Sequence, residues 1–331
     1  MRALIVGLGS IGKRHLKNLK EIDPSISLAV LRQHKKEAKL NELSPLVEEL
    51  FLDKNSAFNW KPDMTLIANP GPFHIQTALD SAKNNSHLFI EKPFSVEMQS
   101  INELIQECQS RKLVLMVGYM LRFFEPLQLM RQALLDDRIG RLLCIRATVG
   151  QYLPDWRPTQ DYRQGVSACK KLGGGAIFEL SHEIDYTRWL GGEVDAVTAQ
   201  AGKFSDLEID VEDIAEIILH FKNNAIGSIH VDMVDRASNR SCRLIGTEGT
   251  LVWDMNKNLV QLYRFDNKLW ADLYNVTELD RNKMYIDELE HFLQCIKNKK
   301  EALINGYEGK KVLEIILAAK QSVAEGKTVT L

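Results

Sequence analysis

The sequence lacks the patterns by which metal centres and thiol chemistry are usually detected. Its five cysteines are far apart and form no C-x-x-C pair, and its eight histidines form no H-x-x-x-H or H-E-x-x-H motif. Zinc ribbons, dithiol redox pairs and helical zinc sites are therefore not predicted. We expect the cysteines to be small buried apolar side chains in a reducing compartment, and we predict no metal site.

Long apolar runs and an excess of charge of one sign are also absent. No stretch approaches the roughly 18 apolar residues that a membrane helix needs, and the first residues turn into glycines too early for a signal peptide. With 42 basic against 44 acidic residues, the chain has no positive field that would hold a polyanion. The sequence therefore predicts a cytoplasmic protein without a nucleic-acid or membrane partner.

The 331 residues have the composition of a globular chain and enough length for two domains of roughly 100–200 residues each. In the first third, short apolar runs without polar alternation are separated by helical patterns, as in a parallel sheet covered on both faces. The runs lie at 2–6, 27–31, 64–68, 87–90 and 113–117. The helical patterns lie at 11–20, 35–43, 74–83 and 96–111. Residues 1–120 are therefore predicted to form a doubly wound domain.

After Tyr119 the pattern changes to alternating strands joined by hairpin signals. Asn223-Asn224 separates two alternating runs at 215–221 and 225–231, and a glycine-containing turn separates 242–245 from 251–253. Helices are predicted at 125–136, 282–297 and 307–324. Residues 121–331 are therefore predicted to form a second α/β domain with a mainly antiparallel sheet.

The motif G-x-G-x-x-G runs from Gly7 to Gly12, with Ser10 and Ile11 between its last two glycines. It follows the first predicted strand and opens a helix, which is the setting of a dinucleotide-binding loop. There Gly7 permits the tight turn, Gly9 lets the backbone approach a pyrophosphate, and Gly12 lets the helix pack close to the strand. A merely structural turn is the alternative.

Arg32 follows the second predicted strand, twenty positions after Gly12, where NAD-selective sites carry an acid for the ribose 2′-hydroxyl. A guanidinium there is suited to a 2′-phosphate, which favours NADP over NAD. A solvated basic turn is the other interpretation.

Polar residues follow the third and fourth predicted strands. Ligands of such sheets bind beyond the carboxyl ends of the strands, so these positions are predicted to line the cofactor crevice. They are Asn69, Pro70, His74, Glu91 and Lys92.

With the glycine loop, the tripeptide Glu91-Lys92-Pro93 resembles the Gfo/Idh/MocA oxidoreductases, the glucose–fructose oxidoreductase and inositol dehydrogenase family. The similarity continues through residues 118–123, 173–175, 181–185 and 246–249. It implies a Rossmann domain followed by an α/β domain with a large open, mainly antiparallel sheet, through which members form homodimers or homotetramers. It also implies oxidation or reduction of a sugar, polyol or nucleotide sugar with NAD(P), as in members from bacterial surface-polysaccharide pathways.

The resemblance implies that Lys92 and His182 handle the proton. Oxidation of an alcohol requires a base within hydrogen-bond reach of the hydroxyl, and both residue types exchange protons near neutral pH in suitable surroundings. Many family members carry an aspartate four residues before the histidine, whereas this chain has Phe178 there and Glu179 one position later. Three residues is still one helical turn, so Glu179 is a candidate for orienting the His182 imidazole, and a carboxylate that points elsewhere is the alternative. Asp185, three residues beyond His182, is the other candidate for orienting the imidazole or contacting substrate.

The polar, aromatic segment before residues 173–175 is the candidate substrate loop. Rings that stack on sugar faces beside forked guanidinium donors suit an acidic or nucleotide-linked sugar, and a loop held by its own aromatic anchors is the alternative. The residues predicted to contact substrate are Arg122, Trp156, Arg157, Tyr162, Glu179 and Asp185.

Three functions fit these residues. The first is an NAD(P)-dependent dehydrogenase, and the second is an NAD-dependent glycoside hydrolase that oxidises its substrate transiently. The third is a non-enzymatic dinucleotide-sensing regulator, which has no use for a proton-transferring pair and is therefore disfavoured by Lys92 and His182.

Overall fold

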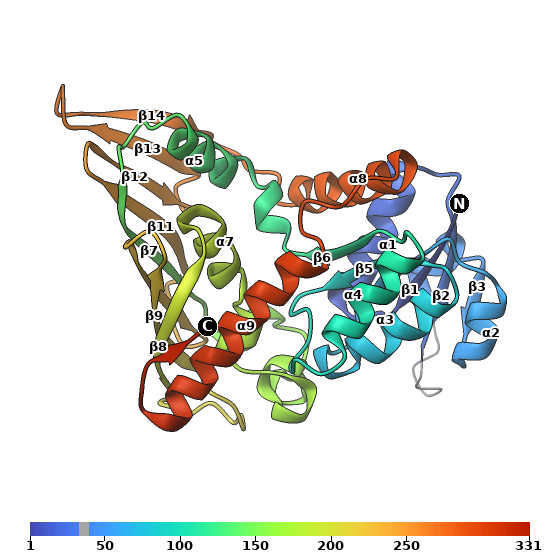
Figure 1. Ribbon diagram of the computed structural model, residues 1–331. Helices are drawn as coiled ribbons and strands as arrows, with labels where there is room; N and C mark the ends of the chain where they lie inside the picture. The colour runs from blue at the N-terminus through green and yellow to red at the C-terminus, as the bar shows by residue number, and fades with distance from the viewer. Residues whose placement is uncertain (33–39) are drawn as a thin grey trace. The chain divides into compact units, whose positions relative to one another are not determined.

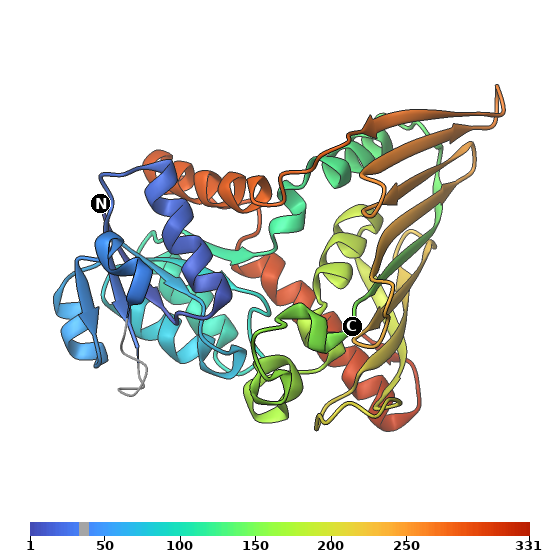
Figure 2. The ribbon, with the colours of Figure 1, turned by 180° about the vertical axis from the view of Figure 1, so that it is seen from behind.

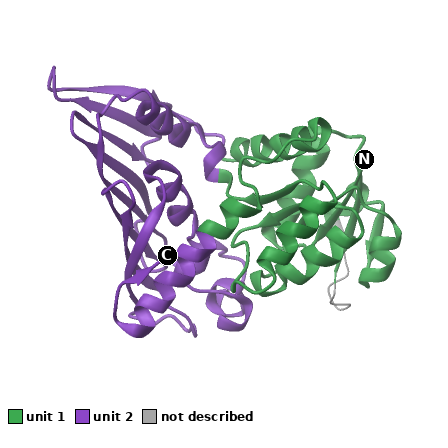
Figure 3. Ribbon diagram, viewed as in Figure 1, with its two compact units in different colours: residues 1–120, 281–311 green, residues 121–280, 312–331 purple. Residues whose placement is uncertain are grey.

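The computed structural model describes residues 1–32 and 40–331 and divides into two compact units (Figure 3). Unit 1 consists of Met1–Met120 and Arg281–Lys311, and unit 2 of Leu121–Asp280 and Val312–Leu331. The sequence places residues 281–311 in the second domain, whereas the structure groups them with the first. Most of the helix predicted at 35–43 lies outside the described residues, and a 3-10 helix follows at Asn41–Leu46.

Unit 1 contains a six-stranded sheet in the order β3-β2-β1-β4-β5-β6, and its neighbouring strands are all parallel. Two halves therefore diverge from β1, and the sequence prediction of a doubly wound sheet is confirmed. The strands are β1 (Arg2–Val6), β2 (Ser27–Leu31), β3 (Glu49–Phe51), β4 (Met64–Ile67), β5 (His87–Glu91) and β6 (Leu115–Gly118).

Helices cover both faces of this sheet, with α1 and α8 on one face and α3 and α4 on the other (Figures 1 and 2). The helix predicted from residue 96 begins only at Ile101, because Ser100 has a left-handed backbone (φ 60°) that a helix does not contain. The helices of unit 1 are α1 (Ser10–Ile22), α2 (Lys54–Asn59), α3 (His74–Lys83), α4 (Ile101–Ser110) and α8 (Lys283–Asn298).

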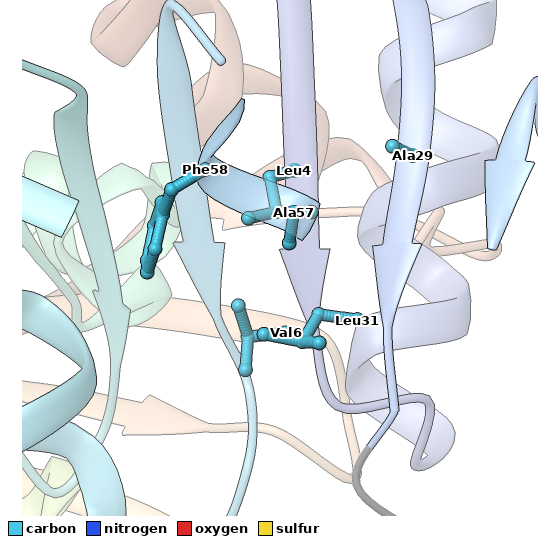
Figure 4. Close-up of a cluster of buried hydrophobic side chains, with 6 residues drawn as sticks. All are labelled: Leu4, Val6, Ala29, Leu31, Ala57 and Phe58. Carbon is cyan, nitrogen blue, oxygen red and sulfur yellow. The ribbon is translucent and has the colours of Figure 1, made fainter. Parts of the chain in front are cut away.

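The edge of the sheet near β2 has a small apolar core of its own (Figure 4). It joins β1 and β2 to α2, with Phe51 and Trp60 packed against it. Because such burial is the main favourable term in folding, this core fixes the β1 and β2 ends that carry the glycine motif and Arg32. Its members are Leu4, Val6, Ala29, Leu31, Ala57 and Phe58.

Unit 2 is built on a nine-stranded sheet in the order β14-β13-β12-β11-β7-β10-β9-β8-β15. The β7–β10 pair is parallel and the other pairs are antiparallel, which confirms the predicted sheet and both predicted hairpins. The strands are β7 (Leu142–Gly150), β8 (Val194–Gly202), β9 (Ile214–Phe221), β10 (Ile226–Asp232), β11 (Asn239–Gly246), β12 (Gly249–Asp254), β13 (Leu259–Arg264), β14 (Leu269–Asn275) and β15 (Val329–Thr330).

The helices of unit 2 lie on one face of the nine-stranded sheet (Figures 1 and 2). In the part of the chain that the structure describes, no helix covers the opposite face, which we call the open face. The helices are α5 (Glu125–Leu135), α6 (Ala176–Glu179), α7 (His182–Gly191) and the second half of α9 (Gly306–Glu325). Over residues 1–32 and 40–331, no helix has the length and apolar character needed to cross a membrane.

Candidate dinucleotide and proton-transfer sites

Two glycines of the motif lie where no side chain fits. Gly7 has a positive φ of 95°, and a Cβ there would approach the backbone of Ala68 and Asn69 to 2.7 Å. A Cβ on Gly12 would lie 2.1 Å from the carbonyl oxygen of Gly7. Glycine at both positions therefore brings the first turn of α1 against the ends of β1 and β4.

Gly9 is glycine for a different reason. It is exposed, has ordinary negative φ (−67°), and a Cβ placed on it would meet nothing within 4 Å. It is the N-cap of α1, where no side chain caps the helix and the first turn holds no acid. Open space in front of an uncapped helix N-terminus suits an anion, so Gly9, Ser10 and Ile11 fit the pyrophosphate of a dinucleotide.

Arg32 leaves β2 beside this loop. The Gly7 amide donates to the carbonyl of Leu31 (3.3 Å), and the Arg32 amide donates to the carbonyl of Phe51 (3.0 Å). These bonds place the half-buried Arg32 at the carboxyl edge of the sheet, next to the strand that carries the glycine motif.

His74 connects the segments that follow β4 and β5. Its Nε2 lies 2.6 Å from the Asn69 carbonyl oxygen and its Nδ1 2.9 Å from that of Pro93. The ring is buried, and this burial lowers the pKa of His74 despite the two carbonyls. His74 therefore ties together the loops that carry Asn69, Pro70 and Lys92; direct contact of His74 with a cofactor stays a prediction.

Glu91 ends β5 and Lys92 follows it directly. The Glu91 carboxylate is nearly buried, with Oε1 2.5 Å from His15 Nε2 and Oε2 accepting the Lys92 amide hydrogen at 3.2 Å. Lys92 itself is half-buried, and its peptide bond to Pro93 is cis. Sequence reasoning missed His15; its signal is a histidine on the inward face of the helix that the glycine motif opens.

In unit 2, His182 begins α7 and is 5% exposed. Asp185 lies one turn further along the same helix and binds the guanidinium of Arg122 through contacts of 2.7–3.1 Å, with both side chains buried. This ion pair fixes α7 to the start of the unit, so the geometry gives Arg122 and Asp185 a structural role beside any contact with substrate.

The continuous helical turn expected between Glu179 and His182 is not present. Helix α6 ends at Glu179 and α7 begins at His182, with Leu180 and Ser181 between them. The Glu179 carboxylate accepts a hydrogen bond from Ser167 Oγ (2.9 Å). Glu179 therefore braces the loop before the glycine run, and sequence spacing alone does not place it beside the imidazole.

The predicted substrate loop is held by its own side chains. The Trp156 indole donates to the Gln151 carbonyl (3.0 Å), and the Tyr162 hydroxyl accepts from the Glu208 amide (3.1 Å). Arg157 is exposed. The contacts agree with the alternative of an aromatic-anchored loop, and substrate binding by this segment stays a prediction. In the described residues, no cluster of three or more His, Cys, Asp or Glu side chains is placed to hold a metal ion.

Two family models match this chain. The model described as an oxidoreductase family with an NAD-binding Rossmann fold matches residues 1–119, and the GFO/IDH/MocA C-terminal domain matches residues 127–252. The chain is also 28% identical to the myo-inositol 2-dehydrogenase of Thermotoga maritima over 348 residues, covering 100% of this chain and 98% of that protein.

Solved structures share the whole fold. A levoglucosan dehydrogenase in complex with NADH has a TM-score of 0.90 at 20% identity, covering 100% of this chain and 98% of that one. The WlbA dehydrogenase from Bordetella pertussis in complex with NADH and UDP-GlcNAcA has a TM-score of 0.83 at 21% identity, with the same coverage. At these identities the likeness shows the architecture of both units.

The glycine geometry predicts opposite outcomes for two substitutions. Gly9→Val is expected to leave the unfolding temperature nearly unchanged and to abolish dinucleotide binding, because its side chain occupies the open space before α1. Gly12→Ala is expected to lower the unfolding temperature, because its Cβ overlaps the Gly7 carbonyl. Thermal unfolding and fluorescence titration with NADH and NADPH measure both effects. If the Gly9→Val variant binds the dinucleotides with native affinity, the phosphates do not bind at Gly9.

Proposed function

Because the chain belongs to the Gfo/Idh/MocA oxidoreductase family, we propose that it transfers a hydride between a nicotinamide dinucleotide and a hydroxyl-bearing carbon of a sugar or polyol. The observation that carries this proposal lies within unit 1. The open helix N-terminus at Gly9 and the half-buried Lys92 both follow strands at the carboxyl edge of one parallel sheet. That edge is where doubly wound sheets bind ligands.

The chain provides distinct groups for each part of the dinucleotide. The backbone at Gly9, Ser10 and Ile11 would hold the pyrophosphate, Arg32 the adenosine ribose, and the loops tied by His74 the nicotinamide half. When bound, the nicotinamide accepts or returns the hydride.

Lys92 and His182 would manage the proton of the reacting hydroxyl. An alcohol that loses a hydride must also lose its hydroxyl proton, so a base has to reach that oxygen. Lys92 follows a strand end that Glu91 and Pro93 constrain, and His182 begins a helix that the Arg122–Asp185 pair anchors. Both groups are thus mounted on fixed backbone, as proton transfer requires.

The substrate class follows from the relatives and from unit 2. The related proteins named above act on inositol and levoglucosan or bind a UDP-sugar, and each of these carries several neighbouring hydroxyls. Exposed Arg157 and the half-buried rings of Trp156 and Tyr162 are suited to the edge and faces of such a compound. A thermal-shift screen of polyols, sugars and nucleotide sugars, with NAD or NADP present, identifies the assay substrate.

We expect Lys92→Met and His182→Phe each to lower kcat with dinucleotide affinity nearly intact. Loss of a general acid–base group typically costs about 10²–10⁴-fold in rate, whereas loss of a surface lysine or a core histidine costs little turnover. If both residues serve one proton relay, the two losses do not multiply in the double variant. Steady-state kinetics and NADH titration give both quantities.

Two results would change the assignment. If Lys92→Met abolishes turnover and His182→Phe leaves kcat and its pH profile unchanged, His182 is structural and the break between α6 and α7 is the reason. If both variants keep full turnover, a non-enzymatic dinucleotide sensor becomes the better description.

We further propose that NADP is the preferred dinucleotide. The support is Arg32 at the end of β2, in the position where an acid would bind the 2′-hydroxyl of NAD. A guanidinium pairs with a 2′-phosphate through charge-assisted hydrogen bonds. The related solved structures contain NADH, so the preference depends on this one side chain.

Arg32→Asp is therefore expected to weaken NADP binding by about 1–3 kcal/mol, since it removes a charge-assisted contact and adds repulsion. NAD affinity should change little. Arg32→Gln, which removes the charge and adds none, is the matched control and should give a smaller loss for NADP. Calorimetric titration of both dinucleotides tests this. An equal loss of affinity for NAD and NADP would show that Arg32 does not bind the 2′-phosphate.

We also propose that two copies of the chain pair through the open face. Arg146 of β7 and Arg243 of β11 lie directly opposite each other there, both exposed, and like charges in that position are unfavourable. Among the described residues neither guanidinium has an acidic partner, while Glu216 and Asp254 lie on the same face of the sheet. A second copy rotated by a two-fold axis would bring those carboxylates toward the arginines.

Light scattering after size-exclusion chromatography tests this pairing. The native chain is expected to elute as a dimer or tetramer, and the Arg146→Glu, Arg243→Glu double variant as a smaller species. A native chain that stays monomeric at high concentration would contradict the proposal.

A further inference from the structure

Glu91 is a nearly buried carboxylate at the end of β5. It is 8% exposed, and alternation along β5 puts it on the same face of the strand as Phe89, which is fully buried. Removal of a carboxylate from water is expensive unless hydrogen bonds compensate it. The Glu91 carboxylate, immediately before Lys92, therefore needs hydrogen-bond donors close to it.

His15 is the first partner. Its ring is fully buried and is held edge-on against Phe89 (5.1 Å between centroids) and near Tyr285 of α8 (6.4 Å). Nε2 lies 2.5 Å from Glu91 Oε1, whereas Nδ1 has no hydrogen-bonding partner among the described residues. Because an ionised carboxylate can only accept, Nε2–H is the donor of this hydrogen bond.

The Lys92 backbone is the second partner. Its amide hydrogen is donated to Glu91 Oε2 at 3.2 Å, so one carboxylate bridges helix α1 and the backbone of the lysine. Gly118, opposite Glu91 in β6, leaves the room for this bridge, because a Cβ there would lie 3.3 Å from the carboxylate carbon. The bridge is thus enclosed by α1, β6 and α8.

We propose that His15 is a positioning residue for Lys92. Through Glu91 it fixes the point at which Lys92 leaves β5 relative to α1, the helix whose N-terminus fits the pyrophosphate. The N-terminus of α1, which fits the pyrophosphate, and Lys92 are then linked through the His15–Glu91 hydrogen bond. Misplacement of a reacting group by about 1 Å can cost about 100-fold in rate. The inference rests on the proposed function of Lys92 and adds a residue that never touches substrate.

Two substitutions separate positioning from simple packing. In His15→Gln the side-chain amide nitrogen reaches the place of Nε2, so the bond to Glu91 is kept. In His15→Asn the amide reaches only the place of Nδ1, so a buried polar group of the same chemistry remains but the bond is lost. Both variants remove the ring contacts with Phe89 and Tyr285.

The first measurement needs no substrate. Trace labelling with acetic anhydride, read by peptide mass spectrometry, gives the reactivity of the Lys92 amine relative to the exposed Lys61. We expect the asparagine variant to label several-fold faster at Lys92, because its backbone tether is released, and the glutamine variant to label at the native rate. Fluorescence titration with NADH should show near-native affinity in both.

The second measurement is turnover. With a substrate from the screen, kcat of His15→Asn is expected to fall about 10- to 100-fold with KM little changed, and His15→Gln to restore most of it. His87→Gln is the matched control at the other end of β5, because it removes the bond from the Val114 amide to His87 Nδ1 (2.9 Å). It should lower the unfolding temperature and leave Lys92 labelling and kcat unchanged.

The inference is overturned if the asparagine and glutamine variants lose equal stability and show native Lys92 labelling, because His15 then only packs. It is also overturned if His87→Gln changes Lys92 labelling as much as His15→Asn does. If no compound of the screen is turned over, the proposed function fails while the labelling experiment still decides the role of His15.

Discussion

The first turn of α1 lies so close to the ends of β1 and β4 that no side chain fits between them. A Cβ on Gly12 would overlap the Gly7 carbonyl, and one on Gly7 would overlap the backbone after β4. This approach directs the uncapped amides of α1 toward open space at Gly9. The second turn of the same helix carries His15, whose Nε2 lies 2.5 Å from Glu91 at the end of β5.

In each unit, a buried charged side chain holds the backbone near a residue that we propose to transfer the proton. In unit 1 the Glu91 carboxylate lies between His15 and the Lys92 amide. In unit 2 the Arg122–Asp185 pair holds α7, which begins at His182. Buried charges of this kind are weak contributors to stability, yet removal of one partner costs about 3–5 kcal/mol. These buried charges matter for geometry, because a fixed backbone restricts the side chains of Lys92 and His182 to a small range of positions.

The sequence predicts the local features of this protein well. Apolar runs, the glycine motif and hairpin turns each depend on a few neighbouring residues. The class of both sheets, the hairpins β9–β10 and β11–β12, and the placement of Arg32 at a strand end follow from them, whereas the short edge strand β3 has no predicted run. Three features escape such reasoning. Helix α8 belongs to unit 1 because Phe292 packs on Phe89, which lies more than 200 positions earlier in the chain. The break after Glu179 depends on backbone angles that spacing does not encode. The role of His15 appears only when the partner of Glu91 is known.

His15 and His74 show why a buried histidine cannot be assigned from its neighbours in sequence. His74 lies at a strand-end loop and looks like a cofactor contact, yet both its ring nitrogens face backbone carbonyls and burial lowers its pKa. His15 lies within a helix and looks like core, yet its Nε2 faces a carboxylate that also binds the Lys92 amide. The two histidines differ in the hydrogen-bond partners of their ring nitrogens. A hydrogen bond to a backbone carbonyl fixes a loop, whereas a hydrogen bond to a buried carboxylate also compensates the carboxylate's charge. The residue next to that charge is where chemistry should be sought, because a protein retains an expensive buried carboxylate where its position has a use.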